Sequence, residues 1–126
     1  MSKILKITGK VYRGQGKGRK LGFKTANLSP DSNQPFPPAG VYASLITIDD
    51  QPHKSVTAVG IFETFEQTKP GIEVYIFNFD QDIYNQPVDL ELIKKIRPIK
   101  KFLDASELKQ QISRDCVEAM KILARF

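Results

Sequence analysis

A basic, glycine-rich segment near the N-terminus contains residue types that can hold phosphates. Its sequence, GQGKGRKLGFKTANLSP at 14–30, places three glycines within five residues, among lysines and an arginine. Clustered glycines weaken a fold unless the bare backbone is needed, and exposed backbone N–H groups can approach phosphate oxygens closely. The segment lacks the Walker A pattern and does not open the long helix of a dinucleotide-binding fingerprint. It is therefore either a phosphate-binding loop or a flexible, solvated hairpin.

Two short, oxygen-bearing side chains follow this loop. Thr25 and Asn27 are two residues apart, so both lie on one face of the chain if it is extended. Together with phosphate oxygens they suit Mg²⁺, which takes few protein ligands and keeps several waters. The alternative is ordinary turn chemistry, in which the Asn27 side chain bonds to its own backbone.

A carboxylate interrupts an aromatic strand face further along the chain. In IEVYIFNF (72–79), Glu73 shares one face with Tyr75, Phe77 and Phe79. If the carboxyl group is buried, its pKa is raised and it can act as a general base. If it lies at a strand end, it is simply exposed.

Arg97 ends the last predicted strand, immediately before Pro98. It either pairs with an acidic group on a substrate or lies at the rim of the sheet with its aliphatic stem buried.

Alternation of polar and apolar residues predicts that these side chains are carried mostly by strands. Predicted strands cover 3–12, 40–49, 54–62, 72–79 and 87–96. The second and third form a hairpin over 41–62, with a turn at the cluster DDQP (49–52). Five or six strands at this short spacing predict an antiparallel barrel or sandwich.

The C-terminal segment alone has helical periodicity. Asp104 and Glu107 fit a capping box, with Asp104 as N-cap and Glu107 reaching back. The apolar stripe of the predicted helix consists of Leu108, Ile112, Cys116, Ala119 and Leu123, widened by Val117 and Met120. We expect one helix of about five turns lying across the barrel.

Composition limits the classes of protein that remain. The 126 residues favour one domain over 1–126, and no apolar run is long enough for a membrane span. Cys116 and His53, each alone of its type, make a disulfide and a structural zinc site implausible, and the single cysteine fits the reducing cytoplasm. The net charge of +5 indicates an anionic partner without choosing between a nucleotide and a nucleic acid. Aromatic residues are not interleaved with Lys and Arg on a strand, which argues against nucleic-acid binding.

The order of these features resembles the riboflavin kinase family from about residue 8 to 122. The family pattern G-x-G-R-x-x-G-x-P-T-A-N is matched by Gly16, Gly18, Arg19, Gly22, Thr25, Ala26 and Asn27. AGVYA at 39–43 and the run RPxxxFxxxxxLxxQIxxD from Arg97 to Asp115 match as well, and Glu73 lies between them. The most specific part is T-A-N together with the downstream glutamate.

The resemblance implies a mostly β fold: a six-stranded antiparallel Greek-key barrel with a C-terminal α-helix packed on it. It implies transfer of the γ-phosphoryl group of ATP to the ribityl 5′-hydroxyl of riboflavin, giving FMN and ADP, with Mg²⁺ or another divalent cation. Glu73 would be the catalytic base, Thr25 and Asn27 would hold the metal and phosphate oxygens, and Arg97 and Phe102 would lie near the flavin. The loop residues implied to bind the nucleotide are Gly14, Gly16, Lys17, Gly18, Arg19 and Gly22.

Some positions depart from the family pattern. Lys24 stands where the family has proline, and Asn85 replaces a usual glycine. Ala58 and Glu63 stand in place of asparagine and proline in the family's N-I-G-x-x-P-T-F. These departures bear on rate and flavin affinity more than on fold. Many bacterial relatives carry an adenylyltransferase domain before the kinase, and because this sequence starts at the barrel, FAD synthesis is not expected.

Two further classes remain open at this point. One is a non-catalytic flavin- or nucleotide-binding module derived from the kinase fold, and the other is a small basic barrel that binds nucleic acid. A cytoplasmic monomer acting on riboflavin and ATP, with no nucleic-acid or membrane partner, is the expectation.

Overall fold

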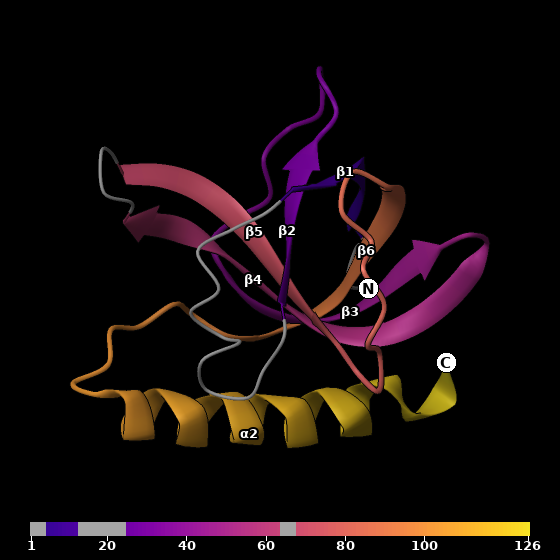
Figure 1. Cartoon of the computed structure of the whole chain (residues 1–126). Coiled ribbons are helices and arrows are strands. Elements are labelled where there is room, and N and C mark those ends of the chain that lie inside the picture. Colours follow the sequence, from indigo (N-terminus) through magenta and orange to yellow (C-terminus); the bar gives the residue numbers. More distant parts are fainter. Residues whose placement is uncertain (1–4, 13–24, 64–67) are drawn as a thin grey trace.

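The computed structural model describes residues 5–12, 25–63 and 68–126, and it builds them into strands followed by one long helix (Figure 1). The strands are β1 (Leu5–Tyr12), β2 (Thr25–Pro30), β3 (Gly40–Ile48), β4 (Gln51–Glu63), β5 (Thr68–Ile76) and β6 (Pro87–Arg97). The helix α2 (Ala105–Ile122) follows, with a short 3₁₀ turn η1 (Leu123–Arg125) at its end. Every strand pair is antiparallel, and the order β1-β2-β5-β4-β3-β6 closes through β1 and β6 into a barrel. The predicted fold class is confirmed.

The barrel interior is filled by apolar side chains from all six of these strands. Ile7, Leu28, Ile46, Ile72 and Leu90 are among the most deeply buried. Strand alternation explains which side chains are buried, because each of these residues is next to at least one polar or half-exposed residue that faces the other side of its strand.

Three hydroxyl groups are also buried inside the barrel. The Ser44 hydroxyl lies 2.8 Å from that of Ser55 and 2.7 Å from that of Thr57. Each group therefore has a partner, which removes the penalty of burying a polar atom without one.

A second apolar cluster lies outside the barrel, beneath α2, which runs across one end of the molecule (Figure 1). Ala119 and Leu123 of the helical segment pack on Val41, Ala43 and Val56 from the outer faces of β3 and β4. The helix buries one stripe, as its periodicity predicts, with Cys116 partly buried against the same cluster.

The prediction that Val117 and Met120 belong to that stripe is wrong. Val117 is 56% exposed and Met120 is 60% exposed, because both lie on the flank of the helix that turns away from the barrel. The stripe of α2 that contacts β3 and β4 is therefore narrower than the apolar residues in the sequence predict.

The N-terminus of α2 is capped as the sequence predicts. The Asp104 carboxylate accepts a hydrogen bond from the Glu107 backbone N–H at 2.8 Å. The return bond of the capping box differs slightly: Glu107 accepts from the Leu103 N–H at 3.3 Å, one residue before the cap.

Strand boundaries differ from the prediction at two turns, and β5 begins at Thr68 and not at residue 72. The β3–β4 turn consists of Asp49 and Asp50 alone, so β4 begins at Gln51 and not at residue 54. β5 ends at Ile76 because Asn78 takes a positive φ of 52° that breaks the strand. β2 was not predicted as a separate strand, since six residues ending in Pro30 carry little alternation of their own.

Candidate active site

The predicted catalytic carboxylate and a predicted metal-binding amide lie on adjacent strands, directly opposite each other. Asn27 of β2 is the cross-strand partner of Glu73 of β5. Opposed residues on antiparallel strands point to the same side, with Cβ atoms about 5 Å apart. Leu28 and Ile72, the next pair, belong to the barrel interior, so Asn27 and Glu73 face the outside.

The same row continues over two more strands. Tyr12, the last described residue of β1, is opposite Asn27, and Ala58 of β4 is opposite Glu73. Ala58 packs with the cluster beneath α2. The row therefore runs from the exposed phenol of Tyr12, across the two candidate site residues, to the part of the barrel that the helix covers.

Thr25 is in the neighbouring row on the same face. Its partner is Tyr75 of β5, and Tyr75 is opposite Val56, which lies under α2. Thr25, Asn27 and Glu73 are all half-buried. The strand register thus brings these three predicted site residues together on one outer shelf of the barrel, beside the helix.

The electrostatics of the shelf reflect this proximity. The pKa of the Tyr12 phenol is raised, first by burial and then by the negative charge of Glu73. The pKa of Tyr75 is raised by burial and by the nearby Cys116 thiol of α2. Glu73 therefore lies close enough to Tyr12 to influence its ionisation, and Tyr75 lies close to the helix.

Arg97 and Phe102, the residues predicted for the flavin, are in contact with each other. The Arg97 guanidinium carbon lies 5.8 Å from the centre of the Phe102 ring, and the Lys100 ammonium lies 5.2 Å from it. Phe102 belongs to the connection from β6 to α2, and Arg97, the last residue of β6, immediately precedes it. The nucleotide-loop residues at 14, 16, 17, 18, 19 and 22 lie outside the described residues, so their predicted role stays a prediction.

The β6–α2 connection passes over the shelf near its row of candidate residues. The Ile99 side chain lies 3.2 Å from the position that a Cβ on Gly60 would occupy. Gly60 is opposite Gly71, two residues along from the Ala58–Glu73 pair on the same face. Two paired glycines leave the barrel surface flat here, which admits the connection.

Asp115 is a buried residue to which the sequence analysis gave no role. It accepts hydrogen bonds from Arg97 Nε at 2.8 Å and Nη2 at 2.7 Å, and from Gln111 Nε2 at 3.1 Å. The sequence feature that could have indicated this role is the position of Asp115 at the end of the run that begins at Arg97. It is an acidic residue one helical turn after Gln111 and one position before Cys116 of the apolar stripe. Tyr12 was also missed, because its position beside Glu73 depends on strand pairing alone.

The donors on the shelf suit a hard divalent cation. Hydroxyl, amide and carboxylate oxygens from Thr25, Asn27 and Glu73 are the ligand types that Mg²⁺ prefers. Within the described part of the chain, no three His, Cys, Asp or Glu side chains are grouped as a metal site. A cation held here would therefore need oxygens from phosphates or water as well.

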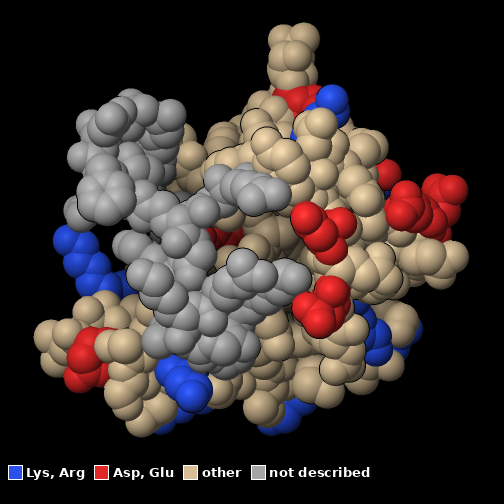
Figure 2. Space-filling view, viewed as in Figure 1, with Lys and Arg blue, Asp and Glu red and all other residues tan. Residues whose placement is uncertain are grey.

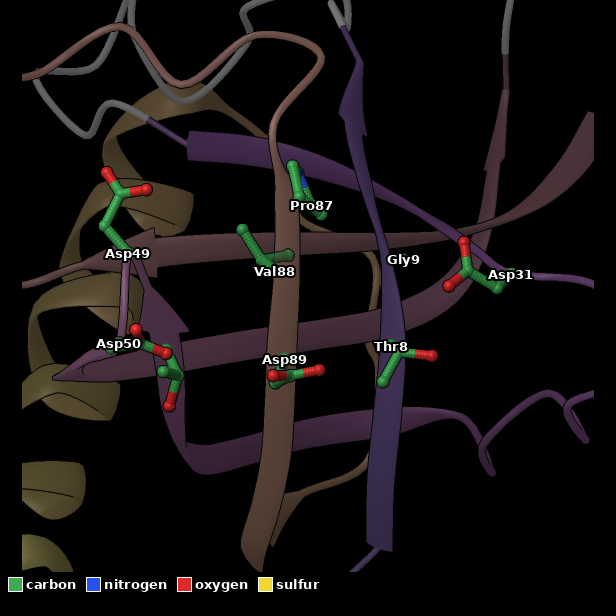
Figure 3. A pocket seen from close by; sticks show the side chains of 9 residues that line it. Thr8, Gly9, Asp31, Asp49, Asp50, Pro87, Val88 and Asp89 are labelled. Carbon is green, nitrogen blue, oxygen red and sulfur yellow. The ribbon is translucent and has the colours of Figure 1, made fainter.

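A separate depression of about 530 Å³ lies over β1, β3 and β6 (Figure 3). Its lining is acidic, and Figure 3 shows Asp49 and Asp50 at the hairpin end, Asp31 on the far side and Asp89 between them. It contains none of the predicted site residues.

On the face shown in Figure 2, most of the Lys and Arg side chains lie in the lower part, where α2 runs, and most of the Asp and Glu side chains lie on the barrel above. In the described residues no helix is long and apolar enough to cross a membrane.

The described residues thus form a small closed antiparallel barrel that carries a carboxylate, an opposed amide and a neighbouring hydroxyl on its outer face. The particular family follows from comparison with known proteins: the family model for riboflavin kinase (flavokinase) matches residues 1–123. This chain belongs to the riboflavin kinase family.

One curated relative agrees with this assignment, and two solved structures share the fold. The bifunctional riboflavin kinase/FMN adenylyltransferase of Bacillus subtilis (strain 168) is 36% identical over 123 residues, which cover 95% of this chain and 39% of that protein. A solved structure titled as a macrolide-efflux protein from Streptococcus pneumoniae is 34% identical with a TM-score of 0.82, covering 90% of this chain and 37% of that one. The riboflavin kinase from Trypanosoma brucei shares the fold, with a TM-score of 0.68 at 21% identity over 98% of this chain and 82% of that one. The chain thus spans well under half the length of the Bacillus relative.

Proposed function

We propose that this chain transfers the γ-phosphoryl group of ATP to the ribityl 5′-hydroxyl of riboflavin, giving FMN and ADP. The observation that carries the proposal is the cross-strand pairing of Asn27 with Glu73 on the outer shelf, with Thr25 in the next row. This arrangement puts oxygens that can hold metal and phosphate beside a carboxylate that can accept a proton.

Glu73 is the general base in this proposal. Its carboxylate takes the proton of the ribityl hydroxyl as the oxygen attacks phosphorus, which requires the hydroxyl within hydrogen-bond reach. Glu73 is half-buried, and its negative charge contributes to the raised pKa of the neighbouring Tyr12 phenol.

Thr25 and Asn27 would hold Mg²⁺ together with phosphate oxygens of the nucleotide. Mg²⁺ would supply charge neutralisation on the phosphates during transfer. The two protein oxygens come from one extended strand, β2, so their separation is fixed by strand geometry and not by a loop.

The remaining parts bind the substrates. The basic glycine loop from residue 14 to 22 is proposed to cover the nucleotide phosphates, and the β6–α2 connection with Arg97 and Phe102 is proposed to border the flavin. Phosphoryl transfer requires positioning and charge neutralisation more than covalent chemistry, so this set of groups is sufficient.

The second candidate is a non-catalytic flavin- or nucleotide-binding module. The paired Asn27 and Glu73 favour the kinase, because binding alone does not need a carboxylate beside the metal ligands.

A product assay tests the proposal. The chain is incubated with riboflavin, ATP and Mg²⁺, and FMN and ADP are separated and quantified, with a metal-chelated sample as control. Equal amounts of FMN and ADP that depend on the metal are expected. Binding of riboflavin without FMN formation under Mg²⁺, Mn²⁺ or Zn²⁺ would leave the binding module as the better account.

A further inference from the structure

Arg97, Asp115 and Gln111 form one hydrogen-bonded network between the end of β6 and the middle of α2. The guanidinium and the carboxylate pair through two parallel bonds of 2.8 and 2.7 Å, and Gln111 adds a third donor to Asp115 at 3.1 Å. Two parallel bonds fix the orientation of both side chains, which a single-point contact does not.

The network is withdrawn from solvent. The Asp115 side chain is 4% exposed and that of Arg97 is 17% exposed. A third N–H of Arg97 donates to the Pro98 carbonyl at 3.1 Å, so the guanidinium also binds the first peptide of the connection that follows β6. Arg97 is thus held by groups of its own chain.

These bonds act on the β6–α2 connection at residues 98–104. The connection is fastened at its start by Arg97 and at its end by the Asp104 cap. Between these points Ile99 rests against Gly60 near the Glu73 row, and Phe102 lies beside the Arg97 guanidinium.

We propose that Arg97 is a positioning residue that acts through Asp115: the buried pair holds the 98–104 connection as a wall of the riboflavin-binding side of the active site. This inference rests on the proposed function. The flavin would contact apolar groups of the connection, such as Ile99 and Phe102, and Arg97 itself would remain bonded to Asp115. An Arg97 that contacts the flavin directly is the competing account.

A double-mutant cycle separates the two accounts. Asp115→Asn keeps the shape but presents an N–H where Arg97 Nη2 needs an acceptor, and Arg97→Lys keeps the charge but loses the paired bonds. Arg114→Gln removes a charge from an exposed neighbour on α2 and serves as control. For each chain we would measure kcat, the KM values of riboflavin and ATP, and thermal unfolding.

Each single variant is expected to raise the riboflavin KM by about tenfold or more, while the ATP KM changes by less than about twofold. Arg97→Lys should have no further effect in the Asp115→Asn background, because the residue acts through the partner already lost. An additive effect in the double variant would overturn the proposal in favour of direct contact. Equal rises in both KM values that follow the loss of thermal stability would also overturn it, since a merely structural pair predicts that result.

Hydrogen exchange tests the same inference without substrates. Backbone amides of residues 99–104 should exchange faster in both single variants and at the wild-type rate in Arg114→Gln. Unaltered exchange in the single variants would contradict the positioning role. If Asp115→Asn does not fold, Gln111→Met, which removes one of the three bonds to Asp115 and leaves the pair with Arg97, is measured by itself. It should raise the riboflavin KM and leave the ATP KM unchanged, and an unchanged riboflavin KM would contradict the positioning role. A wild-type chain that makes no FMN would refute the proposed function, whereas exchange at 99–104 still reports on the network.

Discussion

Glu73, the proposed general base, is half-buried on the outer face of β5, opposite Asn27 and two residues from Tyr75. Replacing it with glutamine keeps its size and hydrogen-bonding capacity but removes its basicity. We expect Glu73→Gln to lower kcat by roughly 10²–10⁴-fold, the usual contribution of general-base catalysis, with little change in riboflavin binding. Steady-state rates and fluorescence titration with riboflavin would measure the two effects. Turnover near that of the wild type would remove Glu73 from the mechanism.

Thr25 and Asn27 should both matter for the nucleotide and little for the fold. Their side chains face outward from β2, so alanine at either position leaves the barrel interior intact. Each variant should require more Mg²⁺ for half-maximal rate and bind Mg-nucleotide more weakly. Titration of the rate with Mg²⁺ at fixed ATP measures this, and Ser29→Ala, an exposed site on the same strand, is the control. Unchanged Mg²⁺ dependence in both variants would count against a ligand role.

The β3–β4 hairpin is the element with the clearest local strain. Asp49 and Asp50 both have positive φ, 50° and 64°, which is the conformation of a two-residue type I′ turn. Glycine takes this conformation without the cost of about 1 kcal/mol that a side chain adds. Asp50→Gly should therefore raise the free energy of unfolding by up to about 1 kcal/mol, measured by denaturant titration. Asp50→Ala removes the same charge and should not stabilise; an equal gain in Ala would assign the effect to charge instead.

The elements predictable from sequence were those with a strong period or a cap. β1 and the first part of β6 alternate between polar and apolar residues, and β3 is rich in β-branched and aromatic residues. α2 has the Asp104 cap together with a helical stripe. β2 is short, ends at Pro30 and has no period of its own; it becomes a strand because β1 and β5 bond to it on both sides. Pairing of this kind is tertiary information that a local pattern does not contain.

The candidate site was likewise predictable from the sequence only in part. Glu73 stood out as a charge on an aromatic strand, and Thr25 and Asn27 stood out by their spacing. That Asn27 faces Glu73, that Tyr12 lies beyond it, and that Arg97 pairs with Asp115 all depend on register or on packing of the helix. The family resemblance supplied the roles of the residues, and the structure supplied which of them meet.

At the scale of the whole molecule, the helix and the barrel share a pH-sensitive boundary. Burial, with a smaller contribution from the Asp115 charge, raises the pKa of the Cys116 thiol from 9.0 to about 11. The folded chain therefore keeps a proton that the unfolded chain releases between these values. This group leaves stability unchanged below pH 9.0 and lowers it as pH rises from 9.0 to about 11.

Cys116→Ala should flatten the alkaline fall in the free energy of unfolding over that pH range. Denaturant titrations at several pH values measure the slope, and Val117→Ala, at an exposed neighbouring position, should leave it as in the wild type. An equally steep fall in the Cys116 variant would assign the alkaline loss to other groups, such as Tyr75, whose pKa is also raised by burial.

The closure of the barrel between β1 and β6 has a consequence for folding during synthesis of the protein. Leu5 pairs with Leu92, so β1 has no partner on that side until β6 (Pro87–Arg97) has been made. At translation rates of about 5–20 residues per second, β1 emerges roughly 4 to 17 seconds before β6 is complete. During that interval its apolar face is open to other chains. Only synthesis of β6, followed by α2, closes the barrel and covers the outer face beside Glu73. Nascent chains that stall before residue 87 should therefore be sensitive to protease and bound by chaperones, whereas chains released after α2 should resist.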